Sequence, residues 1–148
     1  MKICVVSDSH GNRDILNKIY NSNPNCNIYL LLGDSELPEE YIYPFISVKG
    51  NCDYFLDYPI YRIIQTPSGN IYCEHGHIHG KGNISLLEKY NCKVYLYGHT
   101  HVHKLERVKD YYFVNPGSVE RPRDSSNGTY LIIDCNQETG FNFMFKEL

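Results

Sequence analysis

The chain has 148 residues and a formal net charge of −3, and its size, charge and composition already exclude several classes of protein. Hydrophobic residues make up 42% and charged residues 21%, ordinary values for a globular protein that argue against disorder. The acidic balance disfavours binding of duplex nucleic acid through its phosphates, and no apolar run approaches the ~20 residues of a membrane span. We therefore expect a single domain over residues 1–148, located in the cytoplasm.

The six cysteines form no recognisable metal or redox motif. No two of them are spaced C-x-x-C, which disfavours a thiolate zinc site and a thioredoxin-type active site. Cys4, Cys73 and Cys135 lie inside strand-like apolar runs, where a thiol usually serves as a small hydrophobic side chain. We expect all six cysteines to be reduced.

The N-terminal part predicts a strand, a helix and a second strand. Residues 2–7 and 28–32 are short apolar runs typical of buried strands, and Asn12 can cap the helix between them. A strand–helix–strand unit of this kind pairs its strands in parallel. Asp8 and Asp34 follow these strands directly, at the edge where open α/β sheets bind their ligands.

The rest of the chain is mostly strands. Pro67-Ser68-Gly69 between two strand-like runs indicates a hairpin. The further strands are expected over residues 46–49, 58–66, 70–74, 93–97, 102–108, 111–115, 129–134 and 141–147, and the helices over residues 13–20, a short stretch after Pro38, and 83–91. These elements predict an α/β fold in which two packed sheets have helices on the outside.

All seven histidines lie next to predicted strand ends, together with several carboxylate and amide side chains. The histidines are His10, His75, His77, His79, His99, His101 and His103, and the others are Asp8, Asp34 and Asn51. Strands that lead to one edge of a sheet bring such groups together. Imidazole and carboxylate ligands in one place suit a borderline divalent metal, and this set is large enough for two ions that share a carboxylate.

Each short motif has a plain structural explanation when it is taken alone. Asp-x-His, Gly-Asp and Gly-Asn after a strand are also common turn and cap chemistry. Two histidines at i and i+2 directly after a strand, as at His99 and His101, seldom arise from packing. The order of all the motifs along the chain is therefore far more specific than any one of them.

In that order, the motifs resemble the five signatures of the calcineurin-like metallophosphoesterases. They are Asp8-x-His10-Gly11-Asn12, Gly33-Asp34, Gly50-Asn51-x-Asp53, His75-Gly76-His77 and Gly98-His99-x-His101. The short length, Asn115-Pro116-Gly117-Ser118 and Arg121-Pro122-Arg123 resemble the small bacterial and archaeal phosphodiesterase branch. The resemblance runs from Lys2 to about Arg123 and implies a four-layer α/β/β/α sandwich of two mixed sheets flanked by helices.

The resemblance implies two divalent metal ions per chain and assigns their ligands. The first ion would be held by Asp8, His10, Asp34 and His101, and the second by Asp34, Asn51, His75 and His99. Asp34 would bridge the two. Manganese is expected, with nickel, iron, cobalt or zinc as alternatives. The candidate catalytic residues are Asp34, Asn51, Asn12 and Asp53.

The implied activity is hydrolysis of a small phosphodiester by a hydroxide that the two metals share. Asn12, at a helix N-terminus, would donate a hydrogen bond to the phosphate. Two alternatives stay open. One is a phosphomonoesterase that acts on nucleotides or proteins at the same site. The other is a non-catalytic scaffold on the same fold, as in the retromer subunit that resembles this family, although scaffold relatives tend to lose metal ligands that this chain keeps.

One position departs from the pattern of many relatives, which have histidine where this chain has Cys52. That histidine serves as a general acid or phosphate contact, oriented by the following aspartate, here Asp53. A neutral thiol is a poor proton donor to an alkoxide. Some members of the small branch also carry cysteine here, so Cys52 agrees with that branch. It disfavours only the efficient hydrolysis of unactivated esters. A small buried filler is the alternative role.

Three histidines are surplus to the ligand set. We expect His77 to orient the site from behind the ligands, His79 to be exposed in a loop, and His103 to line the mouth of the site or to face solvent. Separately, the alternating aromatics Tyr41, Tyr43 and Phe45 are assigned to core packing, with an exposed patch that forms a homodimer or homotetramer as the alternative.

Overall fold

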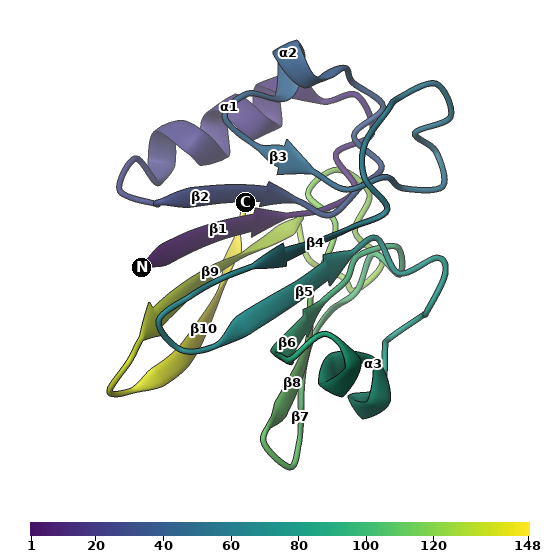
Figure 1. Cartoon of the computed structure of the whole chain (residues 1–148). Coiled ribbons are helices and arrows are strands. Elements are labelled where there is room, and N and C mark those ends of the chain that lie inside the picture. Colours follow the sequence, from purple (N-terminus) through teal and green to yellow (C-terminus); the bar gives the residue numbers. More distant parts are fainter.

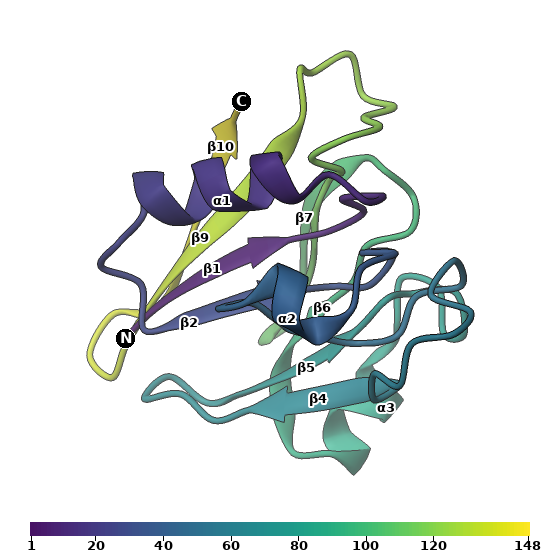
Figure 2. The same cartoon turned by 90° about the horizontal axis from the view of Figure 1, so that it is seen from above.

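In the computed structural model, which describes all 148 residues, two five-stranded sheets lie face to face (Figures 1 and 2). Their strand orders are β10-β9-β1-β2-β3 and β4-β5-β6-β8-β7. The strands are β1 (Lys2–Val6), β2 (Ile28–Leu31), β3 (Ile46–Ser47), β4 (Tyr61–Ile64), β5 (Asn70–Glu74), β6 (Cys92–Leu96), β7 (His103–Val108), β8 (Tyr111–Pro116), β9 (Thr129–Asn136) and β10 (Gly140–Glu147). Each sheet is mixed, with three neighbouring parallel strands, β1-β2-β3 and β5-β6-β8.

Helices cover the outer faces of both sheets, which completes the predicted α/β/β/α sandwich. Helices α1 (Arg13–Ser22) and α2 (Glu39–Ile42) lie over the first sheet, and α3 (Ile84–Lys89) lies over the second (Figure 2). The cap predicted for α1 is confirmed, because Asn12 Oδ1 accepts a hydrogen bond from the N–H of Ile15 at 3.0 Å.

Strand β1 shows why the central strands are apolar on both faces. Ile3 and Val5 point into the core between the two sheets, and Cys4 and Val6 point into the core under the helices. Successive side chains of a strand alternate between its faces. A strand covered on both sides therefore has a continuous apolar run rather than an alternating one, as the sequence of residues 2–7 indicates.

The predicted strands and helices are all present, with small shifts at their ends. The interpretation of the aromatic segment was partly wrong. Phe45 is buried under the helices, but the side chains of Tyr41 and Tyr43 are 47% and 81% exposed. Helix α2 is only four residues long, so it turns Ile42 inward and leaves both tyrosines in solvent.

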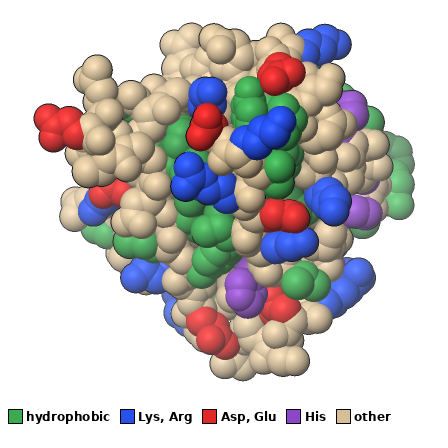
Figure 3. Space-filling model, turned by 90° about the horizontal axis from the view of Figure 1, so that it is seen from below, with side chains coloured by type: hydrophobic (Ala, Val, Ile, Leu, Met, Phe, Trp, Pro, Cys, Tyr) green, Lys and Arg blue, Asp and Glu red, His purple; other side chains and the backbone are tan.

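The surface agrees with the modest net charge. On the face seen from below, lysine and arginine side chains are interspersed with acidic ones around hydrophobic side chains, so no continuous basic surface lies there (Figure 3). None of the helices combines the length and the apolar character needed to cross a bilayer. The six cysteines are unpaired, and Cys4, Cys73 and Cys135 are buried as predicted.

The topology brings the polar motifs to one end of the sandwich. Strands β1, β2 and β5 all run toward the right in Figure 1, and the loops that follow them gather there. Strands β5 and β6 are parallel, so the loop after β6 joins the same end. Residues more than 90 positions apart in the sequence, such as His10 and His101, consequently become neighbours.

Candidate metal centre

The structure brings the predicted ligands into two adjoining groups. Asp8, His10 and His101 form one, and Asp8, Asp34 and His75 form the other; within each group the ligand atoms all lie within 4.8 Å of one another. The loops after β1, β2, β5 and β6 supply these side chains. Each group contains both carboxylate and imidazole, as the sequence predicts for a borderline divalent metal.

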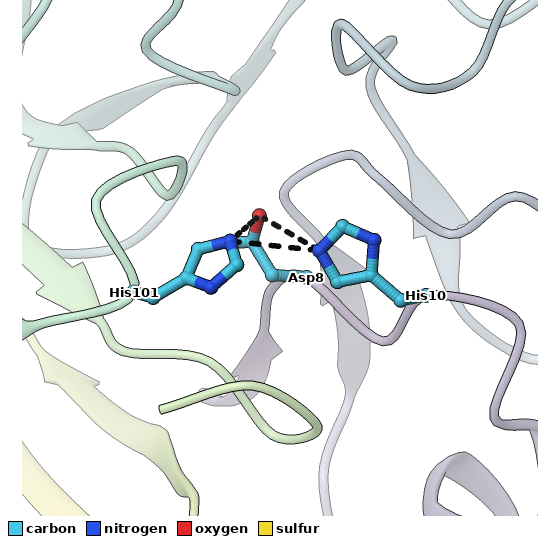
Figure 4. A group of neighbouring side chains, drawn as sticks. All are labelled: Asp8, His10 and His101. Carbon is cyan, nitrogen blue, oxygen red and sulfur yellow. Dashed lines mark hydrogen bonds and ion pairs between the residues drawn. The ribbon is translucent and has the colours of Figure 1, made fainter. Parts of the chain in front are cut away.

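In the first group, two histidine rings face one carboxylate oxygen (Figure 4). Asp8 Oδ1 lies 3.1 Å from His101 Nε2 and 3.9 Å from His10 Nε2, and the two Nε2 atoms are 3.5 Å apart. All three side chains are nearly inaccessible to solvent. Atoms that share one ion at a distance of ~2.1 Å lie roughly 3–4 Å apart, so these spacings suit a common metal.

In three of the four histidines predicted as ligands, the nitrogen that points away from the carboxylates has a hydrogen-bond acceptor. His10 Nδ1 lies 2.6 Å from Glu36 Oε1, His75 Nδ1 lies 2.6 Å from the Leu32 carbonyl, and His101 Nδ1 lies 2.7 Å from the Arg121 carbonyl. These acceptors assign the proton to Nδ1, which leaves a lone pair on Nε2. All three lone pairs face the carboxylates, as in metal-ligating histidines.

The arrangement leaves a buried acceptor without a donor. Asp8 is fully buried, and its Oδ1 accepts no hydrogen bond, whereas its Oδ2 accepts from Ser7 Oγ and from the N–H of His99. Imidazole lone pairs that face a carboxylate oxygen repel it, and an orphaned buried acceptor carries a desolvation cost. A divalent cation between these atoms removes both costs, so the donor set fits a metal.

The second group is centred on His75. Its Nε2 lies 3.0 Å from Asn51 Oδ1, 3.3 Å from Asp34 Oδ2 and 3.9 Å from Asp8 Oδ1. The ring of His99 stands edge-on to that of His75, with the ring centroids 5.1 Å apart. Asp8, rather than Asp34, is the carboxylate common to both groups, and the bridging role of Asp34 stays a prediction.

The backbone at this site is strained in a consistent way. Five of the predicted ligands have left-handed φ angles, namely Asp8, His10, Asp34, His99 and His101. Such conformations cost of order 1 kcal/mol or more for residues other than glycine and cluster at functional sites. Gly50 and Gly98 are needed for another reason, because a Cβ on either would overlap Asp34 or Ser7.

A family model for the calcineurin-like phosphoesterase superfamily domain matches residues 1–138 of this chain. The chain belongs to this superfamily. Two superfamily relatives extend the likeness over most of the chain. "Probable metallophosphoesterase YsnB" of Bacillus subtilis is 30% identical and covers 93% of this chain and 86% of its own length. "Phosphodiesterase YfcE" of Escherichia coli is 26% identical and covers 90% and 88%.

Solved structures of similar fold agree with this membership. A conserved protein of Streptococcus pneumoniae, described as a predicted phosphoesterase, has a TM-score of 0.78 at 24% identity and covers 98% of this chain and 97% of its own. Vps29 of Entamoeba histolytica, solved with zinc, has a TM-score of 0.70 at 17% identity and covers 99% of both chains. At these identities the likeness concerns the fold.

Asp53, predicted as a catalytic residue, organises the loops of the superfamily motifs. Its buried carboxylate accepts hydrogen bonds at 2.8 Å from the backbone N–H groups of Asp34, Glu36 and Gly50. It thereby ties the loop after β2 to the loop after β3. The sequence analysis missed Glu36, whose carboxylate is hydrogen-bonded to Nδ1 of His10. No motif marks Glu36, because its role depends on a contact with a residue 26 positions away.

The other predicted side chains lie around the two groups. Asn12 Nδ2 donates to Glu120, so its contact with phosphate stays a prediction. The exposed ring of His77 lies beside those of His75 and His99. His79 is in an exposed loop as expected, where its Nδ1 lies 2.8 Å from buried Glu74, and His103 is exposed and pairs with Asp124.

Charge and burial divide the histidines of the superfamily site. Burial alone lowers the pKa of His75, but the hydrogen bond that a protonated His75 ring would donate to Asp34 and the charge of Asp8 outweigh burial and raise that pKa. The hydrogen bond that a protonated His101 ring would donate to Asp8 raises the pKa of His101. Burial lowers the pKa of His99. Burial opposes ionisation of Asp34, yet hydrogen bonds from a protonated His75 ring and from the Cys52 N–H hold the pKa of Asp34 far below the ordinary carboxyl value. Protons would therefore compete with a metal ion at His75 and His101.

This competition predicts opposite pH dependences for the metal-free and metal-loaded protein. Raised pKa values at His75 and His101 stabilise the metal-free fold below the unfolded imidazole pKa of about 6.5, and this stability is lost as the pH rises through the folded values. With saturating Mn²⁺ the melting temperature should instead rise with pH, because deprotonated imidazoles bind metal.

The measurement is the melting temperature from about pH 6 to pH 8, with chelator or with Mn²⁺. His101→Gln should weaken both slopes, and His103→Gln, outside the two groups, should keep them. Parallel slopes with and without Mn²⁺ would mean that these imidazoles do not bind the metal.

Proposed function

We propose that this protein is a dinuclear metal-dependent phosphodiesterase. The observation that carries the proposal is Asp8 Oδ1, buried without a hydrogen-bond donor and faced by the Nε2 atoms of His10, His75 and His101. That arrangement is unfavourable unless cations or added protons lie among these atoms. Membership of the calcineurin-like phosphoesterase superfamily gives the chemistry that such cations serve.

The predicted ligands fall into two sets, one for each proposed metal ion. Asp8, His10 and His101 would hold one ion, and Asp34, Asn51, His75 and His99 would hold the other, with Asp34 or Asp8 shared. When bound, two divalent ions activate a water and neutralise charge on the phosphoryl group. Glu36 and the carbonyls of Leu32 and Arg121 keep the imidazoles in the tautomer that binds metal.

The surroundings of the site favour activated diesters. Burial and the charge of Asp34 raise the pKa of the Cys52 thiol to about 11, so it is neutral at pH 7 and gives the leaving group no ready proton. Asp53 is committed to backbone amides and supplies none either. The N-terminus of α1, capped by Asn12, adds backbone N–H groups for a phosphate. The name of the relative YfcE also supports a diester substrate.

The scaffold alternative has weaker support. Fold likeness to Vps29 is its main argument, at 17% identity. A protein that only docked partners would not need three imidazole lone pairs turned toward buried carboxylates. The chain keeps all seven residues that the superfamily motifs assign as ligands, which supports the enzyme over the scaffold.

The direct test removes all metal and restores one ion at a time. Mn²⁺ or Ni²⁺ should restore hydrolysis of bis(p-nitrophenyl) phosphate better than Mg²⁺, because four ligands are imidazoles and Mg²⁺ prefers oxygen. The diester should be cleaved faster than p-nitrophenyl phosphate, with two ions bound per chain. Full activity in excess chelator would exclude a metallohydrolase. Faster cleavage of the monoester would favour the phosphomonoesterase, and two bound ions without hydrolysis of either would favour the scaffold.

A second prediction compares two ligands of unequal charge. Asp34→Asn should reduce metal content and rate more than Asn51→Ala, because it removes a negative charge beside both groups, whereas Asn51 is a neutral ligand. The rate loss in Asp34→Asn should exceed the ~10–100-fold cost of losing an outer partner of a metal ligand. Asp110→Asn, on the exposed turn after β7, is the matched control.

Metal content by mass spectrometry and the rate on the activated diester are measured for all three variants. If Asp34→Asn keeps the wild-type metal content, Asp34 is a turn residue and the two-ion assignment fails.

A further inference from the structure

Two arginines line the same cavity as the candidate ligands. The cavity has a volume of about 220 Å³ and is bounded by His10, Asp34, Asn51, Cys52, His99, His101, Arg121 and Arg123. Arg121 and Arg123 lie on the loop between β8 and β9, and both are exposed. His10, Asp34 and His101 of the two groups form one part of the cavity wall, and the two arginines form another.

Neither guanidinium is neutralised by this protein. Arg121 and Arg123 form no ion pair within 4.0 Å, and their side chains make no hydrogen bond. The carboxylates nearest along the chain are engaged elsewhere, Glu120 by Asn12 and Asp124 by His103 and Ser126. Two unpaired cations beside a polar cavity are therefore free to bind an anion.

The backbone that carries these arginines is tied to the metal groups. The Arg121 carbonyl accepts from His101 Nδ1 at 2.7 Å, and the Arg123 N–H donates to the His101 carbonyl at 2.9 Å. Ser118 Oγ donates to the Asp8 carbonyl at 2.9 Å and accepts from the Arg121 N–H at 2.9 Å. The arginine side chains thus have no partner in the protein, but hydrogen bonds fix their backbone relative to the predicted metal ligands.

The charge around the cavity exceeds what one phosphodiester needs. Two divalent ions with Asp8 and Asp34 leave a formal charge of about +2, the neighbouring carboxylates of Glu36 and Asp53 offset it, and the two arginines bring it back to about +2. A phosphodiester carries a single negative charge. Neither guanidinium comes within 4.0 Å of the Asp8 or Asp34 carboxylate, so both lie beyond the ring of metal-ligating atoms.

We propose that Arg121 and Arg123 bind a second anionic group of the substrate, a phosphate or a carboxylate, beside the phosphoester that is cleaved. This inference rests on the proposed function and names its substrate class: phosphoesters with another anionic group on the same molecule. Arginine suits this role because its planar fork binds such oxygens through two parallel hydrogen bonds.

The test uses two nucleotides that differ only in a second phosphate. Thymidine 3′,5′-bisphosphate and thymidine 5′-monophosphate are titrated into the full-length Mn²⁺-loaded protein, and both dissociation constants are measured by calorimetry. Wild type should bind the bisphosphate ~10-fold or more tighter, as expected for charge-assisted pairs. The double variant Arg121→Gln, Arg123→Gln should lose most of this preference. Arg107→Gln, on β7 away from the cavity, should keep it.

The outcomes separate the two claims. Equal affinities in wild type, a preference that survives in the double variant, or no binding of either nucleotide would overturn the inference. Failure of the wild type to cleave bis(p-nitrophenyl) phosphate would overturn the proposed function, and the two dissociation constants could still be compared.

Discussion

The site depends on one electrostatic constraint: electron-rich atoms are forced together in a place without water. Asp8 Oδ1 is buried and accepts no hydrogen bond, and three imidazole nitrogens lie within 3.9 Å of it. Without a cation or added protons these atoms repel one another. A cation bound among these atoms would relieve the repulsion, so metal binding would also stabilise the fold. The same contact explains why protons would compete with a metal ion.

The rest of the fold holds that unfavourable arrangement in place. Parallel strands deliver the loops to one end of the sandwich, and the apolar core between the sheets fixes the strands. Left-handed backbone at the ligand positions turns the side chains inward, and glycines at positions 50 and 98 leave space for the carboxylates. Asp53 and Ser118 then tie neighbouring loops together through backbone hydrogen bonds.

The sequence predicts the elements well, and it also marks polar residues that the fold brings together, because both depend on local pattern. Apolar runs mark the strands, and the Asp, Asn and His residues at their ends mark the site. Partners that act across the fold leave no such trace: Glu36 behind His10 is one, and the Arg121 carbonyl behind His101 is another. The exposure of Tyr41 and Tyr43 was given only as the alternative to core packing, because it depends on how short α2 is. The sequence also does not decide whether Asp8 or Asp34 lies between the two groups, because this depends on three-dimensional geometry.

Anomalous diffraction at the manganese absorption edge, from crystals of the Mn²⁺-loaded protein, tests this account most directly. It predicts two peaks roughly 3.5–4 Å apart. One should lie within bonding distance of His10 Nε2 and His101 Nε2, the other within bonding distance of His75 Nε2, and an Asp8 or Asp34 oxygen should lie between them. A single peak away from Asp8, or manganese bound through Nδ1 atoms, would contradict the claim that the inward-facing lone pairs define a two-metal centre.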